Sequence, residues 1–288
     1  MAEPSSRTGL AAALGSFAIW GFAPLYWRML AGIPPGAVVA HRVLWSAVLV
    51  GAVVLGLGVG RAELGKLREP RVLLAMLAST SLIVVNWFVF LWAIVNGRVT
   101  EVSLGYYANP LYNVLLGWLF LRERIGPLQL AAVACASVSV AYMTWSLGEL
   151  PWVSLVLALS FGTYGLVRKL AGVSALPGLA IETGICAPFC LGYLLFFSAG
   201  GQSPAQWGLL MLGGVVTASP LLLFAVGARR LRYSTLGMVQ YLAPTLQLGV
   251  AVLGFGEPFT RHHAFTFAGI WLGVGLYALD ALRSSKRA

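Results

Sequence analysis

Residues 183–228 of the chain read TGICAPFCLGYLLFFSAGGQSPAQWGLLMLGGVVTASPLLLFAVGA and contain no charged side chain. A helix crosses the hydrocarbon core of a bilayer with about 20 apolar residues, so this stretch is long enough for two spans. The segment 200–204, Gly-Gly-Gln-Ser-Pro, is typical of a turn and divides the stretch. We therefore predict two membrane helices here, at 177–198 and 206–226.

Charge-free windows of similar length recur along the rest of the 288-residue chain. Only 10% of the residues are charged and 59% are hydrophobic, whereas a soluble domain has about 25% charged residues. This composition excludes an ordinary soluble protein, a disordered chain, a coiled coil and a disulfide scaffold. The sequence predicts an all-α integral membrane protein with ten transmembrane helices, at 9–28, 36–58, 72–95, 101–121, 127–145, 151–168, 177–198, 206–226, 234–255 and 263–281.

The net charge of +10 follows the predicted loops, in which Lys and Arg mark the cytoplasmic side of a membrane protein. With the N-terminus inside, the cytoplasmic side holds Arg7, Arg61, Lys66, Arg68, Arg71, Arg122, Arg124, Arg168, Lys169, Arg229, Arg230, Arg232, Arg283, Lys286 and Arg287. The opposite side holds only Arg28, Arg98 and Arg261. We therefore predict a multi-pass protein of the cytoplasmic (inner) membrane, with both termini in the cytoplasm. This distribution accounts for the basic charge without a nucleic-acid partner.

The two halves of the chain share residues at nearly constant offsets. One set recurs 134 positions later, where Tyr107, Pro110 and Glu123 match Tyr241, Pro244 and Glu257. Another recurs 141 positions later, where Gly21, Leu25 and Arg28 match Gly162, Leu166 and Lys169. Five helices per half is an odd number, so the second half must be inverted relative to the first. We predict two inverted five-helix repeats, at 9–145 and 151–281, an architecture typical of transporters.

Several longer motifs resemble a known family. Residues 86–111 read NWFVFLWAIVNGRVTEVSLGYYANPL, and shorter motifs are HRVLWS at 41–46, SFGTYGLVRK at 160–169 and QYLAP at 240–244. Together they resemble the RarD group of the EamA family, in the drug/metabolite transporter superfamily. The resemblance covers about 15–280 and implies a ten-helix inner-membrane carrier, although the group's label of chloramphenicol sensitivity identifies no physiological substrate. One departure is Ala108, where the group commonly has a larger aliphatic residue; we expect this to change pocket volume and not protein class.

Three ionisable residues fall well inside predicted spans, where such groups are costly. His41 and Arg42 lie in the second predicted helix and Glu182 lies in the seventh, opposite His41 at the 141-residue offset. One interpretation is a gate or a proton-coupling pair, since histidine titrates near neutrality. One alternative is that each group is packed and hydrogen-bonded to neighbouring helices. Another is that Glu182 pairs permanently with Arg42 or with a cytoplasmic-end base such as Arg168, stays charged and serves only as a gate. We assign His41, Arg42 and Glu182 to coupling or gating.

Two equivalent helices carry a central proline next to amide side chains. Asn109 and Pro110 lie in 101–121, and Gln240 and Pro244 lie in 234–255. Proline frees a backbone carbonyl, which is tolerated where protein or a cavity satisfies it, so such a pair points to a midplane site. The alternative is contact between helices through the amides. With nearby aromatic residues, the predicted substrate-binding set is Trp20, Asn86, Trp87, Phe90, Tyr106, Tyr107, Asn109, Tyr164, Ser219, Gln240 and Tyr241.

An aromatic cavity of this kind suits an amphipathic solute or a cation. We therefore predict a secondary active or facilitative transporter that moves a small amphipathic metabolite or drug-like solute by alternating access. An integral-membrane enzyme and a channel or sensor remain alternatives. The spacing of His, Cys and acidic residues predicts no metal, no cofactor and no catalytic residue, and the three cysteines are expected to serve packing. The lipid bilayer is a necessary partner. The sequence does not determine the oligomeric state, for which a monomer and a homodimer are the alternatives.

Overall fold

A computed structural model describes residues 4–96, 98–147, 152–197, 202–256, 259 and 261–285. These residues form helices and include no β-strand. The elements are α1 (Pro4–Met29), α2 (Pro35–Gly56), α3 (Gly60–Gly65), η1 (Lys66–Arg68), α4 (Pro70–Val95), α5 (Val99–Leu119), α6 (Pro127–Leu147), α7 (Trp152–Leu170), α8 (Ala175–Phe197), α9 (Pro204–Arg230), α10 (Tyr233–Gln240), α11 (Leu242–Gly249), the π-helical η2 (Val250–Gly254) and α12 (Arg261–Ser285).

Local sequence explains where several helices begin. Proline is the first residue of α2, α4, α6 and α9, a position where its missing N–H is not needed and its fixed φ suits the helix. Ser203 adds a capping box to α9, because its hydroxyl accepts from Gln206 N while the Gln206 side chain accepts from Ser203 N. The turn predicted between α8 and α9 is partly described, and its residues 200 and 201 lie outside the described ranges.

Eight helices in the described part of the chain are long and apolar enough to cross a membrane. They are α1, α2, α4, α6, α7, α8, α9 and the Tyr233–Gly254 segment that contains α10, α11 and η2. The other two predicted spans correspond to α5 and α12, which carry more polar residues and do not meet that criterion. The membrane fold is therefore established, and ten spans stay a prediction.

Two elements differ from the expected pattern. The loop expected after 58 contains the short helices α3 and η1. Sequence analysis did not predict them, because this charged segment lacks a helical repeat of apolar residues. The single helix expected at 234–255 is interrupted at Tyr241 and ends in a π-helical turn. Pro244 lies in the first turn of α11, where it is tolerated, while Pro110 lies inside the unbroken α5. Equivalent prolines therefore have different effects in the two halves.

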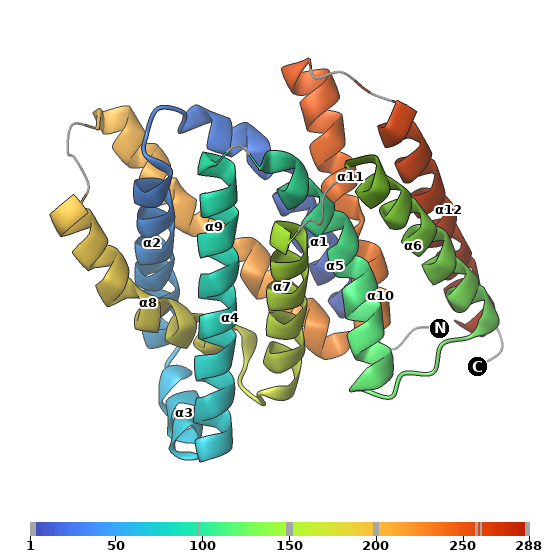
Figure 1. The fold of residues 1–288 in the computed structure, drawn as a ribbon. Coiled ribbons are helices and arrows are strands. Elements are labelled where there is room, and N and C mark those ends of the chain that lie inside the picture. The colour runs from blue at the N-terminus through green and yellow to red at the C-terminus, as the bar shows by residue number, and fades with distance from the viewer. Residues whose placement is uncertain are drawn as a thin grey trace.

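Helices from the two halves of the chain interdigitate instead of forming separate bundles (Figure 1). The main packing partners are α1 with α9, α2 with α8 and α9, α4 with α7, α5 with α7 and α10, α1 with α11, and α6 with α12. The first helix begins and α12 ends at the same end of the bundle, which also carries α3 (Figure 1). We call this end the basic end, because Lys66, Arg68, Arg124, Lys169 and Arg230 lie at the helix ends there.

The closest approach between α2 and α9 depends on Gly214. A Cβ added there would lie 2.6 Å from the carbonyl carbon and from Cβ of Trp45. The Ser46 hydroxyl donates to Gly214 O at 3.0 Å, so the two helices touch through backbone atoms. Small residues serve this purpose in membrane bundles.

We predict that Gly214→Ala lowers the melting temperature of the purified protein, because the methyl group forces α2 and α9 apart at a cost of about 1–3 kcal/mol. Gly208→Ala is the matched control on the same helix, since nothing lies within 4 Å of its added Cβ. Thermal unfolding in detergent measures both variants. Equal melting temperatures for the two would contradict the close contact.

Candidate functional site

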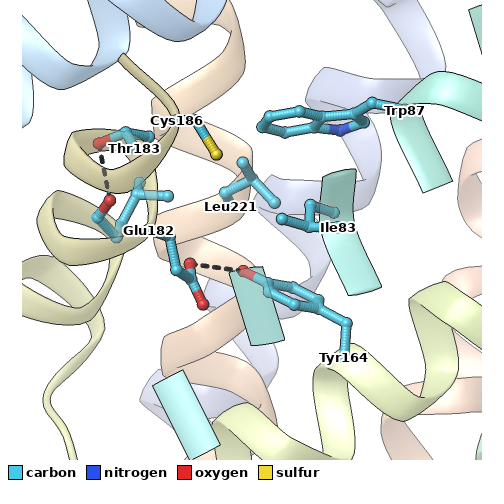
Figure 2. A pocket seen from close by; sticks show the side chains of 8 residues that line it. Ile83, Trp87, Tyr164, Glu182, Thr183, Cys186 and Leu221 are labelled. Atoms are coloured by element: carbon cyan, nitrogen blue, oxygen red, sulfur yellow. Dashed lines mark hydrogen bonds between the residues drawn. The ribbon is translucent and has the colours of Figure 1, made fainter. Parts of the chain in front are cut away.

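Glu182 lies in a cluster of polar side chains buried between α4, α7 and α8 (Figure 2). Ser79 Oγ donates to Glu182 Oε1 at 2.6 Å, and the Tyr164 hydroxyl donates to Oε2 at 3.3 Å. Arg168 Nε lies 3.5 Å from Glu182 Oε1, with both side chains almost completely buried. The pairing of Glu182 is therefore with Arg168. Sequence analysis left Arg42 and Arg168 as alternative partners of Glu182 and did not single out Ser79.

Arg168 is fixed by further contacts. Its Nη2 donates to Ala175 O at 3.1 Å and its Nη1 lies 3.6 Å from the Met76 sulfur. The guanidinium packs directly on Gly178, where an added Cβ would collide with it at 1.9 Å. Buried ion pairs depend on further hydrogen bonds to both groups. This cluster provides them for the Glu182 carboxylate and for Arg168 Nη2, while Arg168 Nε faces the carboxylate at ion-pair distance without a hydrogen bond.

A narrow cavity adjoins this cluster, and in this conformation it is too tight to admit a water molecule (Figure 2). Its lining combines Glu182, Thr183 and Cys186 of α8 with Tyr164 of α7. The remaining lining residues are apolar or aromatic: Ile83, Trp87, Leu179 and Leu221. The predicted site residues Trp87, Tyr164 and Glu182 therefore meet in one place.

Asn109, Asn113 and Gln240 form a second buried cluster between α5 and α10. Gln240 Nε2 donates to Asn109 Oδ1 at 2.8 Å, and Asn113 Nδ2 donates to Gln240 Oε1 at 2.8 Å. Asn109 Nδ2 donates to Ala158 O on α7 at 3.0 Å. In this structure the amides bind one another and a neighbouring helix, as the helix-contact interpretation expects. Their contact with substrate stays a prediction.

The stretch of α2 around Arg42 differs from both clusters because three of its buried polar atoms lack hydrogen-bond partners, whereas each cluster has one such atom, Arg168 Nε or Asn113 Oδ1. Arg42 Cζ lies 5.3 Å from the Trp27 ring centroid and 5.0 Å from the Trp87 ring centroid. The buried atoms His41 Nδ1, Arg42 Nε and Trp45 Nε1 have no hydrogen-bond partner. His41 packs edge-on against Trp207 of α9, with ring centroids 5.1 Å apart. Arg42 and His41 therefore do not reach Glu182, and each occupies its own environment.

The other predicted substrate-binding residues are dispersed around these clusters. Trp20 packs against Phe161 and Phe224, and Asn86 Nδ2 donates to Leu157 O and to Ser160 Oγ. The remaining contacts belong to three groups of residues: Phe90 with Tyr106, Tyr107 with Phe267 and the Tyr241 hydroxyl, and Ser219 with the carbonyl of Val215 in its own helix. The structure thus joins part of the predicted set and leaves the rest in packing contacts.

Three carboxylates to which sequence analysis assigned no site role connect the halves of the chain. Glu63 accepts from Ser174 N and Ser174 Oγ, before α8, and Glu123 accepts from Tyr233 N and Ser234 N at the start of α10. At the opposite end, Glu101 accepts from Val153 N at the start of α7. Carboxylates commonly bind the N–H groups at helix starts. The sequence could not predict which distant helix start each of these carboxylates binds.

Glu63 lies outside the candidate spans, in α3. Partial burial raises its pKa, but hydrogen bonds from Ser174 and Lys66 outweigh that effect and hold the pKa below its usual value. A lowered pKa in the folded protein contributes stability above the unfolded pKa, and this is lost as the pH falls through the folded pKa. The contact of α3 with α8 is therefore intact at neutral pH.

Comparison with known proteins gives the family. The profile of the EamA-like transporter family matches residues 7–145. A Pseudomonas aeruginosa protein named as an uncharacterized transporter is 47% identical, with 100% of this chain and 98% of that protein covered. This chain belongs to the EamA-like transporter family. Protein RarD of Escherichia coli is 38% identical over 100% of this chain and 99% of its own length.

Further comparisons agree with the RarD group of this family. The chloramphenicol-sensitive protein RarD of Pseudomonas aeruginosa is 34% identical over 98% of this chain and 97% of its own length. A solved crystal structure with 20% identity has a TM-score of 0.74 and covers 96% of this chain and 98% of its own. That likeness concerns the fold alone. Among the residues described for this EamA-family chain, no group of three or more His, Cys, Asp or Glu could hold a metal ion.

We predict that Asn109→Ala and Gln240→Ala are coupled in stability by about 0.5–3 kcal/mol, because each removes a partner of the other in a buried network. A double-mutant cycle of thermal unfolding measures the coupling. Asn96→Ala combined with Gln240→Ala is the control, since the exposed Asn96 amide bonds only to Trp92 O in its own helix. Additive effects of Asn109→Ala and Gln240→Ala would show that the two amides do not support each other.

Proposed function

We propose that this protein is a secondary transporter that moves a small amphipathic solute across the cytoplasmic membrane by alternating access. It does so with ten spans in two inverted repeats, 9–145 and 151–281, and with both termini on the cytoplasmic side. Glu257 and Pro151 belong to this repeat assignment and lie outside the described residues. Full-length relatives named as transporters support the general class.

One observation carries the proposal, namely that the main packing pairs map onto one another when the halves are exchanged. The exchange replaces α1 by α7, α2 by α8, α4 by α9, α5 by α10 and α11, and α6 by α12. The pair α1 with α9 then becomes α7 with α4, and α5 with α7 becomes α10 and α11 with α1; both of the resulting pairs are present. The pairs α2 with α8, α5 with α10 and α6 with α12 map onto themselves. This symmetry supports two inverted repeats that can exchange conformations.

The contacts at the basic end support a conformation that is closed on that side. Glu63 and Glu123 connect the halves there, and Lys66 Nζ donates to Gly172 O at 3.0 Å. The pair of Glu182 and Arg168 lies deeper in the bundle than these contacts. Glu182 is seven residues, or about 10 Å, from the start of α8. We assign this cluster to gating and proton coupling, with Trp87 and Tyr164 facing the solute path.

Two other functions are separated from transport by one reconstitution experiment. A screen for solute counterflow in proteoliposomes should find a solute whose exchange saturates with concentration. Linear flux without saturation would indicate a channel, and chemically altered solute would indicate an enzyme. Absence of exchange for every solute in a broad metabolite pool would overturn the proposed function.

Alternating access predicts opposite changes in exposure at the two ends. Cys186 lines the cavity beside Glu182, so in a Cys135→Ala, Cys190→Ala background it reports on the basic end. A second reporter, Val38→Cys, lies near His41 on α2. Glu63→Gln with Glu123→Gln weakens the contacts at the basic end, and should increase impermeant maleimide labelling of Cys186 from the cytoplasm. Labelling of the Val38→Cys reporter from outside should then decrease.

Glu69→Gln is the control for that experiment, because Glu69 is exposed near the same helices and no ion pair or side-chain hydrogen bond is found for it. It should leave both labelling rates unchanged. Increased labelling of both reporters in the double variant would indicate loosening of the whole bundle and contradict alternating access.

Glu182→Gln tests proton coupling. Opening of the basic end would separate Glu182 from Arg168, and an unpaired carboxylate within the membrane is costly enough to favour binding a proton. Glutamine resembles the protonated acid but cannot release a proton. The variant should keep solute counterflow, and it should lose accumulation driven by a pH gradient and solute-induced proton movement. Retained accumulation would exclude Glu182 as the coupling group, and loss of counterflow as well would leave it a gating role only.

A further inference from the structure

Arg42 is a partly buried cation with a buried Nε, and the Glu182 cluster does not use it. Its guanidinium lies against the rings of Trp27 and Trp87, and its charge is close enough to interact with the Tyr26 and Tyr106 hydroxyls. The ion pairs found among the described residues join other groups, and Glu182 already has Arg168, Ser79 and Tyr164. Arg42 therefore has aromatic neighbours and no carboxylate of its own in the described part of the chain.

An arginine without a counter-charge is costly inside a span, and cation–π contacts offset only part of that cost. Arg42 Nε, His41 Nδ1 and Trp45 Nε1 are all buried without a hydrogen-bond partner, within five residues of one helix. Buried polar groups in proteins are nearly always paired. The clusters around Glu182 and Asn109 contain one such atom each, Arg168 Nε and Asn113 Oδ1, so it is the concentration of three unpaired atoms that distinguishes α2.

We propose that Arg42 binds the anionic group, a carboxylate or phosphate, of an amphipathic solute; this specifies the solute class of the proposed transport function. The planar guanidinium donates two parallel hydrogen bonds to such groups. Trp27, Trp87 and Tyr106 surround it with aromatic surface on which an apolar part of the solute packs. A cationic solute is disfavoured, because Arg42 already occupies the cation–π position over both indole rings and would repel it.

Trp87 connects this subsite to the Glu182 cavity. The same indole faces Arg42 and lines the cavity beside Tyr164 and Glu182 (Figure 2). Arg42 lies seven residues, or about 10 Å, from the start of α2 at the end opposite the basic end. An anion that draws the guanidinium toward itself would weaken its contact with Trp87 and free one wall of the cavity. Solute binding at Arg42 would thereby affect the gating cluster around Glu182, which lies at a different depth in the bundle.

A probe series with one phenyl ring and different head groups tests the subsite. Phenylacetate and phenyl phosphate carry the anion, phenylacetamide is the neutral counterpart, and phenethylamine is the cation. Tryptophan fluorescence of the purified protein in phosphatidylcholine nanodiscs reports binding, since two indoles contact Arg42. At least one acid should bind about tenfold or more tightly than the amide and the amine. Arg42→Gln should remove that difference, and Arg42→Lys should retain part of it.

Arg28→Gln is the matched control, because Arg28 also lies over an aromatic ring, 4.3 Å from the Phe255 centroid. It should keep the preference for the acid. Acids that bind no better than the amide in the unaltered protein, or a preference that persists in Arg42→Gln, would overturn the proposal. Suppression of acid binding by phosphatidylglycerol in the nanodisc would overturn it in favour of a lipid-headgroup site.

Counterflow of the same probes separates this proposal from the proposed function. Arg42-dependent acid binding without exchange of any solute would retain the anion subsite and overturn transport. Exchange that is equal for phenylacetate and phenylacetamide would retain transport and overturn the subsite.

Discussion

The starts of three helices in the second half of the chain are capped by carboxylates of the first half. Glu63 binds the N–H of Ser174 before α8, Glu101 binds that of Val153 in α7, and Glu123 binds those of the first residues of α10. A helix start has unpaired N–H groups and a positive dipole, which a carboxylate satisfies. In a membrane protein these groups need protein partners or the interface. The second half therefore depends on the first for the starts of these three helices, in agreement with the interdigitated packing.

These caps are distributed unequally between the ends of the bundle. Glu63 and Glu123 act at the basic end, where Arg168 in the last turn of α7 pairs with Glu182, and Glu101 acts at the opposite end. Any conformation that opens the basic end must break carboxylate contacts to two helices and uncover the buried ion pair. The energetic barrier to opening is therefore concentrated in a few electrostatic contacts. Such contacts respond to charge and protonation, whereas the apolar packing between the same helices does not.

Sequence predicted the membrane fold because apolar length is a property of each segment alone. It did not predict the interruption at Tyr241, since Pro110 and Pro244 have the same local character. The difference arises from neighbours: a Cβ on Gly237 would lie 2.6 Å from Pro110 O, so α10 packs on the backbone of an unbroken α5. The helix α3 was missed for a similar reason, because its contacts with Ser174 and Gly172 are far away in sequence.

In the candidate site as well, the sequence identified individual residues but not the partners that they contact. The cost of burying a charge in a span identified Arg42 and Glu182 from sequence, but it could not state that Glu182 binds Arg168 while Arg42 lies on two tryptophans. Distances between helices decide that, and one sequence does not contain them.

The sequence did place Glu182 opposite His41 at the 141-residue offset, next to Arg42. In this conformation Glu182 is paired near the basic end, where Glu63 and Glu123 connect the halves. The Arg42 guanidinium, near the other end, contacts only the rings of aromatic residues among the described contacts. Under the proposed mechanism this asymmetry is expected, because a carrier that binds solute from one side must leave polar groups unpaired on that side and satisfied on the other.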